Sequence, residues 1–344
     1  MSPNTPLIFY KNCLLCPRRC GVDREAGRLG YCGETSALRL AYAGIHRGEE
    51  PPITGSGGSG TIFVSGCNLG FAFCQNYQIS TGNQISQTAD ADNSAVNNGR
   101  ALGRIVDTGE FADICLALQE KGAENINIVT GSHAAPALAL GIEAARKRGL
   151  SIPVLWNSSG YEGTETLEIL KDFVDVYLPD LKTMDSDFAS KFFNAPDYPE
   201  HAAQGIIKMM EYRKLSFAPV TETLVSGVMV RHLVIPGYMK VTRQVLALFS
   251  ENCVGSGHSR ALLSLMTQYT PVQAPSSMAR GGKTGIPDSY VSESEYEMVL
   301  SMLDEFGIDD GFCQELVTGS DWLPDFTRSN PFSSELSLPV WHWR

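Results

Sequence analysis

TIFVSGCNLGFAFCQNYQIS, at residues 61–80, joins an apolar, β-branched run to a loop that carries two cysteines. The opening run is typical of a buried strand, and Ser65-Gly66 is a typical end for one. Cys67 and Cys74 therefore lie just beyond the C-terminal end of a strand. In parallel α/β barrels, functional side chains gather at this edge of the sheet.

Cysteines in such a loop are typical ligands of an iron–sulfur cluster. Three thiolates can hold three irons of a [4Fe-4S] cluster and leave the fourth iron open to a substrate. Cys67 and Cys74 supply two thiolates, whereas Phe71 has no lone pair for iron. The cluster is then absent, labile or completed by another ligand, and Cys115 or Cys253 is an open candidate for that ligand.

This loop resembles the CxxxCxxC loop of the radical S-adenosylmethionine (SAM) superfamily, with Phe71 in place of the middle cysteine. The longer run GCNLGFAFCQNYQIS resembles a glycyl-radical-enzyme activase-like branch, named for the pyruvate formate-lyase activating enzyme. Five more segments resemble that branch in family order: CLLCPRRCGV at 13–22, HRGEEPP at 46–52, NSSGYE at 157–162, LPDLK at 178–182 and VRHLVIPG at 230–237. The resemblance covers most of the chain.

The resemblance implies an oxidoreductase that uses a [4Fe-4S] cluster and SAM. Such a protein cleaves SAM reductively to a 5′-deoxyadenosyl radical, and activation of a glycyl radical enzyme is one use of that radical. The implied partners are a protein or small-molecule hydrogen donor and a reductant such as a flavodoxin or ferredoxin. Phe71 motivates the alternative, a catalytically degenerate paralogue that acts as a metal-binding scaffold or a partner-binding protein.

Apolar runs alternate with helical patterns about six times, which predicts βαβ units and a parallel sheet. The fold class is therefore α/β, and the resemblance implies a partial (β/α)6 TIM-like barrel with a Cys-rich N-terminal cap. The predicted strands are 61–64, 126–129, 153–156, 174–178, 228–230 and 262–265. The predicted helices are 111–121, 135–148, 164–173, 201–213, 241–251 and 292–305.

Three regions are predicted along the chain. Residues 1–55 form the Cys-rich cap, residues 56–320 form the barrel, and residues 321–344 form a C-terminal tail. The stretch 81–98 has almost no large apolar residue and is predicted to be a polar surface insertion.

Polar side chains that follow or end the predicted strands are candidates for binding SAM or acting on a substrate. The alternative for those in loops is that they are helix N-caps and solvated loop residues. The predicted cofactor-binding residues are Asn76, Asn157, Ser159 and Arg231, and the predicted catalytic residues are Asp180, Lys182 and His232.

A second metal site is predicted near the N-terminus. Its ligands are Cys13, Cys16, Cys20 and Cys32. Four thiolates suit the closed coordination of a structural zinc ion, and they equally suit a second iron–sulfur cluster. The remaining alternative is four reduced, partly buried cysteines.

Composition excludes several classes of protein. The chain has 344 residues, 43% of them hydrophobic, and a formal net charge of −11. No basic run offers a surface for phosphates, so nucleic acid is not an expected partner. No window reaches membrane-spanning length and no signal peptide is apparent, so we expect a cytoplasmic protein with no membrane partner. Nine cysteines, six of them in two tight groups, suit metal binding in a reducing compartment.

Overall fold

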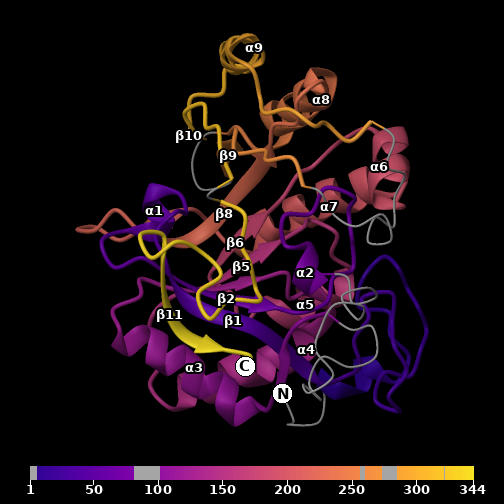
Figure 1. Ribbon diagram of the computed structural model, residues 1–344, viewed down its shortest axis with the longest axis vertical. Coiled ribbons are helices and arrows are strands. Elements are labelled where there is room, and N and C mark those ends of the chain that lie inside the picture. Colours follow the sequence, from indigo (N-terminus) through magenta and orange to yellow (C-terminus); the bar gives the residue numbers. More distant parts are fainter. Residues whose placement is uncertain (1–5, 81–100, 256–259, 273–284, 321) are drawn as a thin grey trace.

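A computed structural model describes residues 6–80, 101–255, 260–272, 285–320 and 322–344. One curved sheet runs through it, in the strand order β10-β9-β8-β6-β5-β4-β2-β1-β11, with β3 on β1 and β7 on β8 (Figure 1). The strands are β1 Leu38–His46, β2 Ser59–Val64, β3 Arg104–Val106, β4 Ile126–Val129, β5 Val154–Ser158, β6 Val176–Pro179, β7 Ser216–Phe217, β8 Leu224–Leu233, β9 Leu262–Met266, β10 Gly311–Cys313 and β11 Ser337–His342. The helices are η1 Pro6–Tyr10, α1 Pro51–Thr54, α2 Tyr77–Ser80, α3 Thr108–Glu120, η3 Ser132–Ala134, α4 Ala135–Lys147, α5 Thr164–Leu170, α6 Ser186–Phe193, α7 Tyr198–Tyr212, α8 Met239–Asn252 and α9 Glu293–Glu305.

Strands β2, β4, β5, β6, β8, β9 and β10 are parallel from each neighbour to the next. The order has two ends, at β10 and β11, so the sheet curves without closing. This confirms an α/β fold with a partial TIM-like barrel, and all six predicted strands are present. Every residue of β2, β4 and β6 is buried, as expected for parallel strands covered on both faces.

The six predicted helices are α3, α4, α5, α7, α8 and α9, with ends that differ by a few residues. Helices α8 and α9 lie at one end of the sheet and α3 at the other (Figure 1). α3 and α4 pack closely, since a Cβ on Gly141 would come within 2.4 Å of the Phe111 ring. Helix α9 begins with a capping box between Ser292 and Glu295.

Several elements were not expected, among them α6, β1 and β11. Helix α6 begins after Asp185, whose carboxylate accepts the N–H groups of Asp187 and Phe188, and ends at Asn194 in the left-handed region. Strand β1 pairs antiparallel with β2, and β11 pairs antiparallel with β1. Parts of the predicted cap and tail therefore belong to the central sheet. The predicted insertion at 81–98 lies outside the described residues, and the division into cap, barrel and tail stays a prediction.

Candidate functional site

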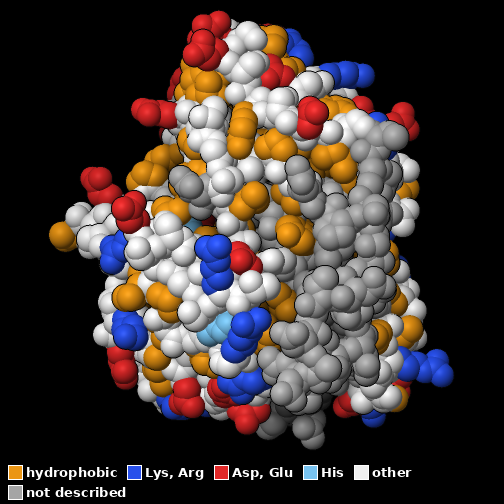
Figure 2. All heavy atoms as spheres, in the orientation of Figure 1, with side chains coloured by type: hydrophobic (Ala, Val, Ile, Leu, Met, Phe, Trp, Pro, Cys, Tyr) orange, Lys and Arg blue, Asp and Glu red, His pale blue; other side chains and the backbone are white. Residues whose placement is uncertain are grey.

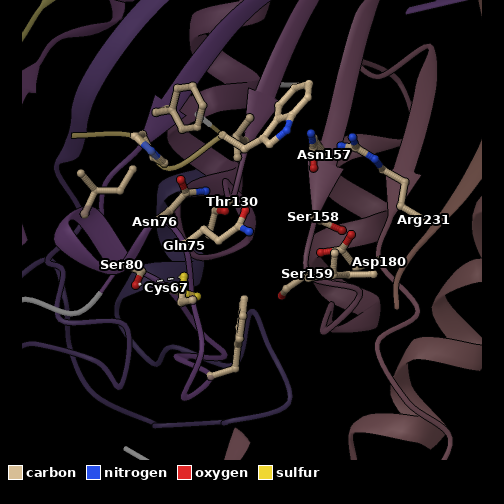
Figure 3. Close-up of a pocket in the computed structure, with 18 of the residues that line it drawn as sticks. Cys67, Gln75, Asn76, Ser80, Thr130, Asn157, Ser158, Ser159, Asp180 and Arg231 are labelled. Atoms are coloured by element: carbon tan, nitrogen blue, oxygen red, sulfur yellow. Dashed lines mark hydrogen bonds between the residues drawn. The ribbon is translucent and has the colours of Figure 1, made fainter. Parts of the chain in front are cut away.

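A pocket opens where the C-terminal ends of the parallel strands meet, at the edge where barrels place functional residues. Figure 3 shows Asn157 and Asp180 on one side of this pocket and Cys67 on the other. Of the residues predicted from the sequence, those that line it are Cys67, Cys74, Asn76, Asn157, Ser159, Asp180, Lys182 and Arg231. We call this space the mouth pocket.

Cys67 and Cys74 lie on the wall that follows β2, and both side chains are buried. Cys67 Sγ accepts the N–H groups of Leu69 and Gly70 at 3.3 and 3.4 Å. Cys74 Sγ accepts the Ser80 hydroxyl at 3.6 Å. Burial, and then the neighbouring Cys67 sulfur, raises the pKa of Cys74 to about 12. Cys74 is therefore a protonated thiol at neutral pH, and it must lose that proton to bind a metal.

Phe71 lines the same wall as the two cysteines. Its ring stands edge-to-face against Phe73 and Phe193, with centroids 5.2 and 6.0 Å apart. Lys182 Nζ lies 4.4 Å from the centroid of the Phe71 ring, at cation–π distance. Both kinds of contact are favourable, so the phenyl ring is held in the pocket wall.

A [4Fe-4S] cluster with one open iron does not fit these donors. Among the residues that line the described pocket, the cysteines are Cys67 and Cys74, where such a cluster needs three. Cys115 is buried within α3 and Cys253 ends α8, so neither lines the mouth pocket. In the part of the chain that the structure describes, no group of three or more His, Cys, Asp or Glu side chains is arranged to hold a metal ion.

Asp180 and Lys182 form an ion pair just beyond β6, with Lys182 Nζ 2.5 Å from Asp180 Oδ2. The Tyr198 hydroxyl accepts the Lys182 N–H at 3.0 Å and is a donor to the carbonyl oxygens of Ser159 and Asp180, both at 2.9 Å. Gly160 has φ +75°, and a Cβ there would meet the Asp180 carbonyl oxygen at 2.1 Å. One hydroxyl and one glycine thus fix the ends of β5 and β6 around the pocket.

His232 lies away from the mouth pocket. Successive side chains of a strand point to opposite faces, so Arg231 lines the pocket while His232 faces α8. Its ring nitrogens lie 2.8 Å from the Leu181 carbonyl oxygen and 3.0 Å from Thr242 Oγ1. Burial lowers the pKa of His232 to about 4. Its position is that of a structural residue between β8 and α8, and it does not support the predicted catalytic role.

Two carboxylates that the sequence reasoning missed reach Arg231 from the HRGEEPP segment. Arg231 Nη2 lies 2.9 Å from Glu49 Oε2, and Arg231 Nε lies 2.9 Å from Glu50 Oε1. Asn127 Nδ2 donates to Glu49 at 3.2 Å, and Ser264 Oγ donates to Glu50 at 2.6 Å. Burial opposes the charge of Arg231, but Glu50 and then Glu49 outweigh it and raise its pKa. In the sequence, the two adjacent Glu residues of that segment were the feature that could have indicated this group of ion pairs.

The C-terminal tail supplies another wall of the pocket, through Trp322 and Phe332. Gln78 of α2 fastens the tail, since its Oε1 accepts the Phe326 N–H at 2.7 Å and its Nε2 donates to Asp325 at 3.2 Å. No periodicity in the tail signals these contacts, because their partners lie far away in the sequence.

The N-terminal cysteines lie in one region, where Cys13, Cys16 and Cys32 are buried and Cys20 is partly exposed. A Cβ on Gly30 would lie 3.4 Å from Cys32 Sγ and 3.7 Å from Cys20 Sγ, so these two sulfurs border the same space. The second metal site stays a prediction.

Arg18, which lies among these cysteines in the sequence, ties the N-terminal region to the mouth pocket. Its guanidinium donates to the carbonyl oxygens of Asn68 and Leu69 at 3.0 and 3.2 Å. It also donates to the carbonyl oxygen of Phe193 at 2.9 Å, at the end of α6. The loop that carries Cys67 and Cys74 is thus supported from the N-terminal region.

The described surface is mixed in character. Figure 2 shows acidic and basic side chains interspersed with apolar ones on one face of the molecule. No helix in the described ranges combines the length and the apolar character needed to cross a membrane.

Comparison with known proteins gives the following similarities. No protein-family model matches the chain. An uncharacterized protein of Methanocaldococcus jannaschii, MJ0674, is 27% identical over 268 residues, which cover 76% of this chain and 67% of that protein.

Three solved structures are similar at low sequence identity. Streptococcus suis SuiB has a TM-score of 0.44 and 12% identity, over 72% of this chain and 47% of that one, so the chain spans about half the length of SuiB. A domain of a pyruvate-formate lyase-activating enzyme from Bacteroides vulgatus has a TM-score of 0.34 and 16% identity, over 53% of this chain and 91% of that one. Methylornithine synthase (PylB) has a TM-score of 0.42 and 12% identity, over 69% of this chain and 59% of that one.

Proposed function

We propose that this chain is a radical SAM protein of the activase-like branch that binds SAM in the mouth pocket but does not assemble the [4Fe-4S] cluster. It is then a degenerate paralogue that acts through binding. The observation that carries the proposal is the Phe71 ring, which packs in the pocket wall together with the two remaining thiols, Cys67 and Cys74. The resemblance of the surrounding sequence to the radical SAM superfamily supports the choice of SAM.

The pocket has groups that complement such a ligand. Ser159 Oγ is buried and has no hydrogen-bond partner within the described residues, so it is available to a ligand. Asn157 and Asp180 line the same side and offer amide and carboxylate oxygens to hydroxyl or ammonium donors. Trp322 and Phe332 line the pocket as apolar, aromatic surface for a flat ring. A largely apolar cleft with a few convergent polar groups is typical of small-molecule sites.

Reductive cleavage of SAM, and with it the activation of a glycyl radical enzyme, requires the third thiolate that Phe71 replaces. Lys182 Nζ lies over the Phe71 ring, so it contacts an apolar ring at the position where a cysteine would present a metal-binding thiolate. Binding and cleavage are therefore separable in this chain.

Binding is tested by calorimetric titration of SAM into the purified protein. We expect saturable binding that Asn157→Ala weakens by about tenfold, the effect of losing a hydrogen bond worth roughly 1.4 kcal/mol. Asn252→Ala, at an exposed position near the end of α8, is the matched control and should bind as the parent does. Equal affinity in all three proteins, or no binding, would contradict the proposed SAM site.

Cleavage is tested after anaerobic reconstitution with iron and sulfide, by measuring 5′-deoxyadenosine formed under a strong reductant. We expect background amounts from the unaltered chain and clear production from Phe71→Cys, because that substitution restores the third ligand. Robust product from the unaltered chain would show an active radical SAM enzyme and overturn the degenerate assignment.

A further inference from the structure

A second cavity adjoins the mouth pocket at Arg231. It is lined by Glu49, Glu50 and Ser264, and by Gln314 just after β10. Glu49 and Arg231 line both cavities, so the triad Glu49–Arg231–Glu50 stands at the boundary between them. We call the second space the triad cavity.

One side-chain oxygen of Glu50, a residue that lines this cavity, is left without a partner among the described residues. Glu50 is only 8% exposed, and its Oε1 accepts the Ser264 hydroxyl at 2.6 Å. The same oxygen lies 2.9 Å from Arg231 Nε, an ion-pair contact in which Nε makes no hydrogen bond. Glu50 Oε2 is buried and has no hydrogen-bond partner among the described residues. A buried carboxylate oxygen with no donor is unfavourable, because water has been lost and nothing replaces it.

The charges around this oxygen are also unbalanced. Glu49 and Glu50 carry two negative charges against the one positive charge of Arg231. Nearby, Asp180 and Lys182 neutralise each other. Arg231 is the one Lys or Arg among the described residues that line the triad cavity. One buried negative charge therefore has no cation opposite it.

We infer that the triad cavity binds a cationic group with N–H donors, an alkylammonium or a guanidinium, that places a donor on Glu50 Oε2. Such a group supplies both the missing hydrogen bond and the missing positive charge. The inference deepens the proposed function, because it names the chemical class of a second ligand that would lie beside SAM. Only the statement that this ligand would lie beside SAM rests on the proposed function, because the cavity and its charges are present without SAM.

The test is a ligand-observed NMR titration of the full chain with methylguanidinium, in the absence of SAM. We expect saturable binding, and binding about tenfold weaker or more for Glu50→Gln. Gln keeps an Oε1 acceptor for the Ser264 hydroxyl, and Arg231 keeps its ion pair with Glu49. Glu297→Gln, the same change at an exposed position of α9, should bind as the parent does. N-methylurea, the neutral probe of similar shape, should not bind.

Thermal unfolding without ligand gives an independent readout. If Glu50 carries an uncompensated charge, Glu50→Gln should unfold at the same temperature as the parent or higher. A large loss of stability in Glu50→Gln would show that the triad is complete by itself and would overturn the inference. Equal binding of methylguanidinium by the parent and Glu50→Gln, no binding by the parent, or binding of acetate in its place would also overturn it. Because SAM is not added, failure of this test leaves the calorimetric SAM result untouched.

Discussion

The Tyr198 hydroxyl is expected to hold the mouth pocket together, and Tyr198→Phe removes only that oxygen. The side chain is fully buried, and its ring stands edge-to-face against Phe193 at 5.2 Å, a contact that phenylalanine keeps. The hydroxyl contacts three backbone groups at the ends of β5 and β6: the N–H of Lys182 and the carbonyl oxygens of Ser159 and Asp180.

The expected cost follows from those groups. A buried donor or acceptor that loses its only partner costs about 1–3 kcal/mol. The hydroxyl has one proton to share between two carbonyl oxygens, so the substitution leaves the Lys182 N–H and one carbonyl unpaired. We therefore expect Tyr198→Phe to lower the free energy of unfolding by about 2–3 kcal/mol. Because Asp180 and Lys182 carry pocket side chains, SAM affinity should fall as well.

Urea unfolding followed by tryptophan fluorescence measures this change. Tyr177→Phe is the matched control, because Tyr177 is also fully buried but its hydroxyl has no partner among the described residues. That control should leave stability unchanged or raise it slightly, since it removes an unpaired polar atom. If Tyr198→Phe costs under about 0.5 kcal/mol, or costs no more than Tyr177→Phe, the hydroxyl does not fix the strand ends and the reasoning is wrong.

Two further predictions concern the same framework. Burial lowers the pKa of His232 from 6.5 to about 4. Between these two pH values the unfolded chain binds a proton on this histidine that the folded chain does not bind. The contribution of His232 to folding stability is therefore fully present above pH 6.5 and is lost as the pH falls toward 4. From about pH 7 to about pH 5 this loss amounts to roughly 2 kcal/mol, and urea titrations of His232→Gln should lack it; an unchanged pH slope would contradict the assignment. Gly160→Ala should cost at least about 2 kcal/mol, from positive φ and a clash with the Asp180 carbonyl oxygen. Gly33→Ala, at a similar φ of +81° and with no atom within 4 Å of the added Cβ, carries the backbone strain without the clash and should cost less. Equal costs for the two substitutions would show that the clash contributes nothing.

The strands of the barrel could be predicted from the sequence because of their burial. Parallel strands covered on both faces keep continuous apolar runs, such as the one that ends at Val64, and these runs mark their own positions. The position of Cys67, Asn157 and Asp180 at one edge followed from the same reasoning, because parallel strands end together.

Contacts across long sequence separations were not predictable in this way. Arg231 and His232 both lie in a buried strand, so apolar patterning does not say which of them faces the pocket. The pairing of Glu49 and Glu50 with Arg231 joins segments about 180 residues apart and depends on how the sheet curves. The pocket wall that the C-terminal tail forms depends on β11, an edge strand that pairs with β1. Because the formation of β11 depends on that pairing, the sequence of the tail does not indicate the strand by itself.

Whether Phe71 prevents assembly of the [4Fe-4S] cluster is tested by measuring the iron that depends on Cys67. Iron per chain is measured after anaerobic reconstitution in four proteins: the unaltered chain, Phe71→Cys, and each of these two with Cys67→Ser added. Subtracting the iron of each Cys67→Ser protein from that of its parent removes any iron held at the N-terminal cysteines. We expect almost no Cys67-dependent iron with Phe71 and about four irons per chain with Phe71→Cys. About four Cys67-dependent irons in the unaltered chain would show that another group completes the cluster, and that Phe71 does not prevent its assembly.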